Sequence, residues 1–263
     1  MDAHGPGALL RQWRRRRRLS QLDLALLAGT SARHLSCVET GRARPSRAMV
    51  LRLCGALEIP LRERNTLLLA ADYAPAYRES DLDDRALASV RSALDTMLAA
   101  HEPYPAVVVD RRWDVLAGNR AMPVLMDGTP EHLLRPRPNV FRLTLHPEGL
   151  ASRLVNFHQV RALFLERLLR QVNATGDAGL RELYEEVRRY PLPGGVPEER
   201  ADDQPSGPIQ VPLRVRTPHG ELAMFSTVAT FGAPADVTLS ELAIELFYPL
   251  DEVTGRVLRA LAR

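Results

Sequence analysis

The sequence predicts an all-α N-terminal domain followed by an α+β domain with an antiparallel sheet. Three observations support this fold class. Residues 19–44 contain two short helical segments separated by a glycine, residues 209–249 alternate apolar and polar side chains in several runs, and the excess of basic charge is confined to the first 72 residues. A chain of 263 residues is long enough for two such domains.

The segment from Ser20 to Gly41 predicts two helices joined by a tight turn. Ser20 is a suitable N-cap for a helix that runs up to Gly29, and glycine can end that helix because it adopts positive φ without strain. Thr30 and Ser31 offer the hydroxyl that caps a second helix over residues 32–40, which Gly41 ends. The second helix is therefore expected to begin directly after the turn.

Apolar residues predict that these two helices cross and pack together. Leu24, Ala25 and Leu27 are the candidates for the inner face of the first helix. Leu35 and Val38 are the candidates for the inner face of the second. Because Ala25 is small, it leaves room for a close crossing.

Further helices are expected on both sides of this pair. Leu10 and Trp13, three residues apart, predict the buried face of a helix before it. Residues 46–57 predict another helix, and a segment after Pro60 predicts a last one that closes the domain near Tyr73.

The basic charge belongs to this helical domain. The first 72 residues contain 13 arginines and six acidic residues, whereas the rest of the chain contains 22 arginines and 26 acidic residues, and no lysine occurs. A basic domain favours a negatively charged partner such as nucleic acid. A run of charge is usually a solvated face, so we expect only two of the five arginines from Arg14 to Arg18 to matter for binding.

Motif residues for a known family occur within LRQWRRRRRLSQLDLALLAGTSARHLSCVETGRARPSRAMVLRLCGALEIP. They include the Leu-Ser-Gln opening, Ala-Gly-Thr-Ser at the turn and Glu-Thr-Gly-Arg at the exit. This stretch resembles the XRE-type, lambda-repressor-like helix-turn-helix family. The resemblance implies that residues 8–72 bind double-stranded DNA with the second motif helix in the major groove. It also implies that Arg14 pairs with Glu39, which makes Glu39 structural.

The resemblance implies particular DNA contacts. Arg33 is the best candidate for reading bases, because a guanidinium can donate two parallel hydrogen bonds to guanine O6 and N7. Arg42 and Arg44 suit backbone phosphates, as does Gln21, and His34 is a further phosphate candidate. The expected DNA-binding residues are Gln21, Ser31, Ala32, Arg33, His34, Ser36, Cys37, Arg42 and Arg44. A homodimer would place two reading helices about 34 Å apart on an inverted-repeat operator.

The cysteines and the hydropathy of the chain indicate where in the cell the protein is located. Cys37 and Cys54 are the two cysteines, and we expect both to be reduced because structural disulfides are rare inside cells. Redox sensing by Cys37 is the less favoured interpretation. No apolar run approaches the length of a membrane span, and the N-terminus lacks the apolar core of a signal peptide. We therefore expect a cytoplasmic protein with no membrane partner.

Residues 73–102 predict a connecting helix. Pro75 marks a boundary, and Asp83 is a suitable N-cap for a helix to about Ala100. Its apolar positions, at helical spacing, are Leu87, Val90, Leu94 and Met97 or Leu98. We expect this stripe to pack on the C-terminal domain of its own chain, with a dimer seam as the alternative.

The remaining residues, 103–263, alternate strand and helix patterns. AVVVD and WDVLAGNRA predict a hairpin followed by a helix, and residues 150–172 and 177–190 predict two helices with apolar faces. Strands are expected in IQVPLRVRT, ELAMFSTVATF and LAIELFYPLD, with a turn at His219 and Gly220. Residues 193–208 are expected to form the loop between helices and sheet.

These residues resemble a second known family. YPAVVVDRRWDVLAGNRA, RPNVFRLTLHPEGL, the long helix and ELFYPLDEVT are similar to the MmyB-like ligand-binding domain of transcription regulators, which has a PAS-like fold. The resemblance implies a small apolar ligand such as a fatty acid between sheet and helices. Six aromatic residues are the candidates for the pocket walls, and Arg161 is the candidate for holding a carboxylate. The aromatic residues are Trp113, Phe141, Phe157, Phe164, Phe225 and Phe231.

Catalysis is not expected. The seven histidines are scattered without the spacing of a zinc or cupin metal site, and no nucleophile elbow, phosphate loop or dinucleotide fingerprint occurs. We therefore expect no catalytic residue, metal or cofactor. The alternative to an effector-sensing second domain is a protein-interaction module, and an aromatic stripe at helical spacing can equally be plain core.

Overall fold

The computed structural model describes residues 5–194 and 211–262, which divide into two compact units. The first unit contains the described residues up to Asp81 together with Ala233–Ser240. The second contains the described residues of Leu82–Gly232 and Glu241–Arg263. This division differs from the expected boundaries at 72 and 102, because the connecting segment divides at Asp81 and residues 233–240 pack with the N-terminal helices.

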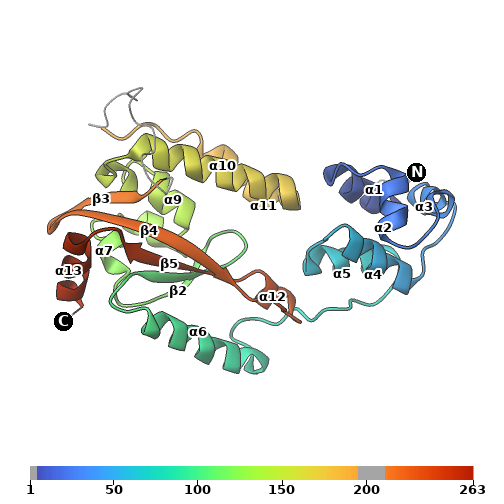
Figure 1. The fold of residues 1–263 in the computed structure, drawn as a ribbon, viewed down its shortest axis with the longest axis horizontal. Coiled ribbons are helices and arrows are strands. Elements are labelled where there is room, and N and C mark those ends of the chain that lie inside the picture. Colours follow the sequence, from blue (N-terminus) through green and yellow to red (C-terminus); the bar gives the residue numbers. More distant parts are fainter. Residues whose placement is uncertain (1–4, 195–210, 263) are drawn as a thin grey trace. The chain divides into compact units, whose positions relative to one another are not determined.

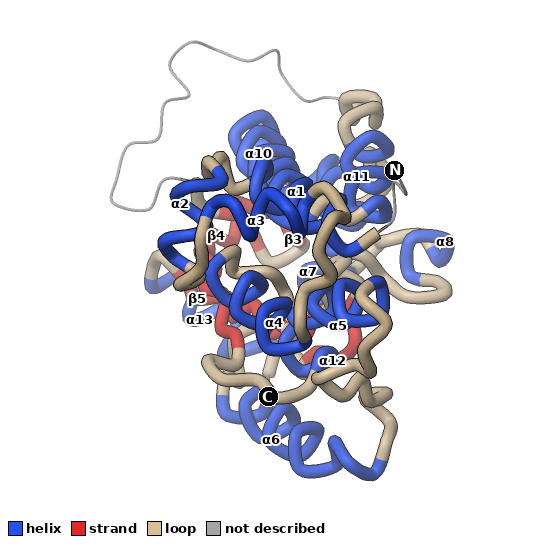
Figure 2. Tube along the Cα trace, turned by 90° about the vertical axis from the view of Figure 1, so that its right-hand side faces the viewer, coloured by secondary structure: helices blue, strands red, loops and turns tan. Residues whose placement is uncertain are grey.

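The described residues up to Asp81 form five helices around one apolar core (Figures 1 and 2). The helices are α1 (Pro6–Arg16), α2 (Gln21–Leu27), α3 (Ala32–Glu39), α4 (Arg47–Ala56) and α5 (Leu61–Ala70). Leu10 and Trp13 are buried in this core, as the sequence predicts. Serine N-caps begin α2, α3 and α4, and Gly29 and Gly41 have φ values of 60° and 74°, so the predicted turn chemistry is confirmed.

The inner face of α2 differs from the prediction at one residue. Leu24 and Ala25 are buried, but Leu27 is 63% exposed, so its prediction is wrong. Ala28 is buried in its place because it lies four residues after Leu24, on the same side of the helix. On α3, Leu35 and Val38 are both buried as expected.

Gly7 lets the backbones of α1 and α3 pack close together. A Cβ added at Gly7 would lie 2.2 Å from the carbonyl oxygen of Val38. We expect Gly7→Ala to lower the free energy of unfolding by about 1–3 kcal/mol, because the backbone of α3 must move. Gly55→Ala is the matched control, since a Cβ there meets nothing within 4 Å and alanine favours helix. Urea denaturation of both variants measures the difference, and equal stabilities would contradict the expected clash.

One antiparallel sheet of five strands organises the described part of the second unit, which confirms the α+β fold class. The strands are β1 (Ala106–Val109), β2 (Val115–Gly118), β3 (Leu213–Thr217), β4 (Gly220–Thr230) and β5 (Ala243–Pro249). Their order is β2-β1-β5-β4-β3, so the last strand of the chain lies beside the first. The long pairing of β4 with β5 sets Ser226 opposite Phe247 and Val228 opposite Glu245.

Helices lie on both sides of this sheet (Figures 1 and 2). On one side lies α6 (Ala88–Ala100), which buries Leu94 and Leu98. The other side carries α9 (Val140–Leu145), the 3₁₀ turn η2 (Leu150–Arg153), α10 (Phe157–Thr175) and α11 (Ala178–Val187). The other helices of this unit are α7 (Pro123–Met126), α8 (Glu131–Leu134) and α13 (Glu252–Leu261). None of the described helices has the length and apolar content needed to cross a membrane.

Two predicted helices begin later than expected. The helix predicted from residue 150 is interrupted because Leu154 pairs with Val215 of β3 and the N–H of Val155 donates to the carbonyl of Arg214 at 2.9 Å. In the connecting segment, a 3₁₀ turn at Arg85–Leu87, capped by Asp84, precedes α6. Most of the predicted loop 193–208, and the first two residues of the predicted strand at 209, lie outside the described residues.

The connection between β4 and β5 belongs to the first unit. It contains α12 (Val237–Ser240), which contacts α5 and buries Val237 completely. Asp236 Oδ2 accepts from the Ser80 N–H at 3.2 Å, and the Val237 N–H donates to the Arg78 carbonyl at 2.8 Å. Two strands of the second unit therefore lead directly into a segment that is packed within the first.

Candidate functional site

The exposed face of α3 carries an arginine that is free to contact a ligand. Ser31 caps the helix, with its Oγ accepting from the His34 N–H at 3.1 Å. Arg33, in the first turn, is exposed and has no side-chain partner among the described residues. Arg42, just past the end of the helix, is exposed in the same way. Ala32, His34, Ser36 and Cys37 are partly exposed on the same helix.

A buried ion pair holds α3 against α1. Arg14 donates from Nε to Glu39 Oε1 at 2.6 Å and from Nη2 to Oε2 at 2.8 Å, as the first resemblance implies. The Glu39 side chain is only 1% exposed. Burial raises the pKa of Glu39, but hydrogen bonds from Arg14 and Gln21 outweigh this effect and hold the pKa below its usual value. Glu39 is therefore a structural anion.

Two residues expected at phosphates make contacts within the fold. The Gln21 side chain donates from Nε2 to Glu39 Oε2 at 2.8 Å. Arg44 donates to the carbonyl of Ala71 at 2.9 Å, and its ion pair with Asp72 is largely exposed. An exposed pair of this kind is worth about 0–1 kcal/mol, so it can exchange Asp72 for another anion at little cost.

Both cysteines carry free thiols. Burial raises the pKa of Cys54 to about 12, so its thiolate is unavailable at neutral pH. Cys37 is partly exposed on α3.

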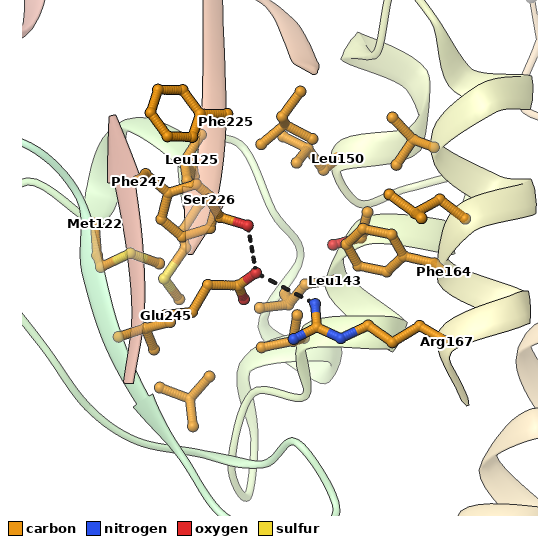
Figure 3. Close-up of a pocket in the computed structure, with 18 of the residues that line it drawn as sticks. Met122, Leu125, Leu143, Leu150, Phe164, Arg167, Phe225, Ser226, Glu245 and Phe247 are labelled. Carbon is orange, nitrogen blue, oxygen red and sulfur yellow. Dashed lines mark hydrogen bonds and ion pairs between the residues drawn. The ribbon is translucent and has the colours of Figure 1, made fainter. Parts of the chain in front are cut away.

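A cavity of about 100 Å³ lies between the sheet and the α9–α10 side of the second unit (Figure 3). Its walls are mainly apolar and include Met122, Leu125, Leu143, Leu150, Phe164, Phe225 and Phe247. Four polar residues also line it: Thr144, Arg167, Ser226 and Glu245. The Glu245 Oε1 accepts from Ser226 Oγ at 2.8 Å and lies 3.4 Å from Arg167 Nη1. The other oxygen, Oε2, is buried and has no hydrogen-bond partner within residues 5–194 and 211–262.

The Arg167 guanidinium is held in place by an aromatic ring. Its central carbon lies 3.9 Å from the centre of the Trp113 ring, a cation–π contact. Trp113 is itself fixed by its Nε1–H, which donates to Gln171 Oε1 at 2.7 Å. Trp113, Gln171 and Arg167 thus form a chain of contacts that orients the guanidinium toward Glu245.

The aromatic residues proposed as cavity walls separate into two groups. Phe164 and Phe225 line the cavity. Trp113, Phe141 and Phe157 are buried in the surrounding core, where Phe141 stands edge-on to both Trp113 and Phe164. Phe231 follows the end of β4 and does not line the cavity.

The arginine proposed as the polar anchor lies elsewhere. Arg161 donates to the carbonyl of Arg188 at 2.8 Å, outside the cavity, whereas Arg167 lines it. Helical spacing does not separate the two, because Arg161 lies three residues before Phe164 and Arg167 lies three residues after it. Glu245 was detectable as the acidic residue within the apolar run AIELF.

Two surface grooves and one cluster of histidine and glutamate side chains differ from this cavity. Two wider surface grooves, of about 600 and 910 Å³, contain no buried polar atom without a partner among the described residues. His132, His146 and Glu148 place potential metal-ligand atoms within 4.8 Å of one another. Sequence spacing did not predict this cluster, because α8 and the residues after α9 bring it together. His132 and Glu148 are exposed.

Two family models match the chain. The model of a helix-turn-helix domain matches residues 7–67. The model of the MmyB-like transcription regulator ligand binding domain matches residues 90–261, which is well over half of the chain. The chain belongs to the MmyB-like transcription regulators. This regulator is therefore a DNA-binding protein with a ligand-binding domain, and its families are not those of enzymes.

Comparisons with individual proteins add little to the family assignment. No curated protein matches the chain. One solved structure, that of an RNA-binding light-oxygen-voltage receptor, is similar at 13% identity over 96% of this chain, with a TM-score of 0.28. The match covers 60% of that receptor's length. With so low a TM-score, the similarity supports no conclusion about fold or function.

Proposed function

We propose that this MmyB-like regulator reads an operator with α3 and changes its DNA affinity when a small, largely apolar effector occupies the cavity of the second unit. The observation that carries the proposal is an apolar cavity lined in part by Glu245, a residue with one buried carboxylate oxygen that has no hydrogen-bond partner among the described residues. Buried polar atoms are nearly always hydrogen-bonded, so an unpaired one indicates a site where another molecule completes the bonding. A plain interaction module would need no such cavity.

Arg33 is the proposed base reader. We expect Arg33→Ala to cost about 1–3 kcal/mol on the preferred operator and to relax preference at one base pair, because a bidentate contact to guanine is lost. Arg42→Ala is the matched control, expected to weaken operator and unrelated DNA alike through loss of a phosphate contact. Fluorescence anisotropy at fixed salt, on an operator selected from a random library, measures both variants. Equal losses on every sequence for both would contradict base reading.

We further propose that a homodimer binds an inverted repeat with half-sites about 34 Å apart, in the cytoplasm. The remaining expected DNA contacts are Gln21, Ser31, Ala32, His34, Ser36, Cys37 and Arg44. For Gln21 and Arg44 this requires an exchange of their present partners. Footprinting of the selected operator, together with the mass of the complex in solution, tests the dimer.

The apolar walls suit a hydrocarbon body such as that of a fatty acid, while the cavity volume limits its length. A drug-sized ligand occupies about 300–1,000 Å³, and an apolar cavity of about 150 Å³ holds benzene. An effector that fits about 100 Å³ is therefore compact unless the walls move. Met122 and Met126 line the cavity, and the flexible methionine side chain permits modest expansion.

The α12 segment supports a route from effector to DNA-binding unit. Ser226 and Glu245, at the cavity, stand on the two strands that α12 joins. α12 is packed against α5 and the Arg78–Ser80 backbone within the first unit. A small displacement of β4 against β5 would therefore pull on α12, which is packed in the first unit, and so reach the DNA-binding helices.

Native mass spectrometry of the purified full chain, followed by organic extraction, tests the effector proposal. A stoichiometric small apolar compound that changes operator affinity when added back supports it. A chain that carries no such compound, but captures a defined protein partner with the same effect on operator affinity, contradicts it and favours the interaction module.

A further inference from the structure

The polar groups of the cavity define what the end of an effector must offer. Glu245 is 2% exposed, and its Oε1 is already satisfied by Ser226 and Arg167. Its Oε2 has no partner in the described part of the chain, and Glu245 lines the cavity (Figure 3). A carboxylate oxygen accepts hydrogen bonds and donates none. The position beside Oε2 therefore calls for a donor.

The charges around the cavity also limit which polar group the effector can carry. The Glu245 carboxylate and the Arg167 guanidinium form one ion pair, so the polar corner of the cavity is balanced in charge. A carboxylate ligand would be repelled by Glu245, and an ammonium ligand would be repelled by Arg167. Either would also have to leave water for an apolar cavity, which is costly for an ion without a counter-charge of its own. An uncharged group escapes all of these costs.

We infer that the effector of this regulator is a compact, uncharged alcohol or phenol whose hydroxyl donates a hydrogen bond to Glu245 Oε2. The hydroxyl oxygen can at the same time accept from the Arg167 guanidinium, since both side chains line the same cavity. The apolar body of the effector contacts Phe164, Phe225 and lining leucines such as Leu143 and Leu150. This inference rests on the proposed function, in which the cavity is the effector site, and it replaces the carboxylate of a fatty acid with a hydroxyl.

Four probes of the same body distinguish the possible polar ends: benzyl alcohol, toluene, benzoate and benzylamine. Each is larger than benzene, so its binding uses the expansion that Met122 and Met126 permit. We expect benzyl alcohol to bind the full chain at least tenfold more tightly than the other three in isothermal titration calorimetry at pH 7. Toluene lacks the donor, while benzoate and the benzylammonium ion bring an unbalanced charge. Equal or tighter binding of benzoate, benzylamine or toluene would overturn the inference while leaving the cavity as an effector site.

Substitution of Glu245 supplies a second, independent readout. Glu245→Gln keeps the shape but removes the negative charge and the free carboxylate oxygen. We expect it to reduce the ratio of benzyl alcohol to benzoate affinity at least tenfold. The control is Glu221→Gln on β4, an exposed residue paired with Arg214, which should leave the ratio unchanged. An unchanged ratio in Glu245→Gln would overturn the inference, and failure of all four probes to bind would overturn the cavity as the effector site as well.

Discussion

Replacing Arg14 with methionine is expected to lower the free energy of unfolding of the N-terminal unit by about 3–5 kcal/mol. The substitution would leave Glu39 as a buried carboxylate with only the Gln21 amide as a side-chain partner. It would also remove the hydrogen bond from Arg14 Nη1 to the Leu19 carbonyl. Urea denaturation followed by circular dichroism measures the loss.

Arg15→Met is the matched control, because Arg15 is the next residue in the same arginine run and its side chain is exposed. We expect a change within about 0.5 kcal/mol. In the double variant Arg14→Met/Glu39→Met, most of the stability should return, because no unpaired charge remains buried. If Arg14→Met and Arg15→Met are equally stable, the pair does not hold α3 in place.

The same pair gives the unit a dependence on pH. The pKa of Glu39 is lower in the folded state than its usual value of 4.5, so the unfolded chain binds the proton more readily. This contribution to stability is fully present above the unfolded pKa and is lost as the pH falls through the folded pKa. Arg14→Met should abolish this acid sensitivity, since the hydrogen bonds that lower the pKa are chiefly those from Arg14.

Replacing Asp236 with alanine is expected to separate effector binding from the DNA response. The substitution removes acceptors for the N–H groups of Ser80 and Thr238, at 3.2 and 2.8 Å, and so loosens α12 from the Arg78–Ser80 backbone. Coupling between two ligand sites is typically about 5–150-fold in affinity. We expect the ratio of operator affinities with and without effector to fall below about twofold, because the α12 end of the β4–β5 connection is held less firmly.

Anisotropy titrations with and without the compound extracted from the purified protein, or benzyl alcohol, measure this ratio. Operator affinity without effector and effector affinity itself should each remain within about threefold, since Asp236 lies at neither site. Asp95→Ala is the control, because Asp95 is an exposed acid on α6. A wild-type ratio in Asp236→Ala would show that the response does not depend on α12.

Local sequence signals predicted the N-terminal unit well. Serine caps, the glycines at 29 and 41 and the spacing of Leu24, Leu35 and Val38 act over a few residues, so they can be recognised without the fold. Leu27 was mispredicted because Ala28 takes the buried position, a choice between neighbours that depends on how α2 packs.

Some features of the second unit cannot be predicted from local sequence patterns. The break between η2 and α10 arises from the pairing of Leu154 with Val215, which lies 61 positions later in the chain. Arg161 and Arg167 are both arginines on α10, and sequence alone does not decide which faces the cavity. That choice follows from the orientation of α10 against β4 and β5 and from the position of Trp113.

The sequence by itself therefore determined the fold classes, the DNA-binding motif and the family, because each depends on residue type at short, fixed spacing. Only the tertiary structure determined which polar residues meet at the cavity and which unit α12 packs in. Glu245, Ser226 and Arg167 come from three elements, and α12 joins the first unit through contacts with residues about 155 positions earlier. Such contacts are formed by packing across the chain, and no local pattern records them.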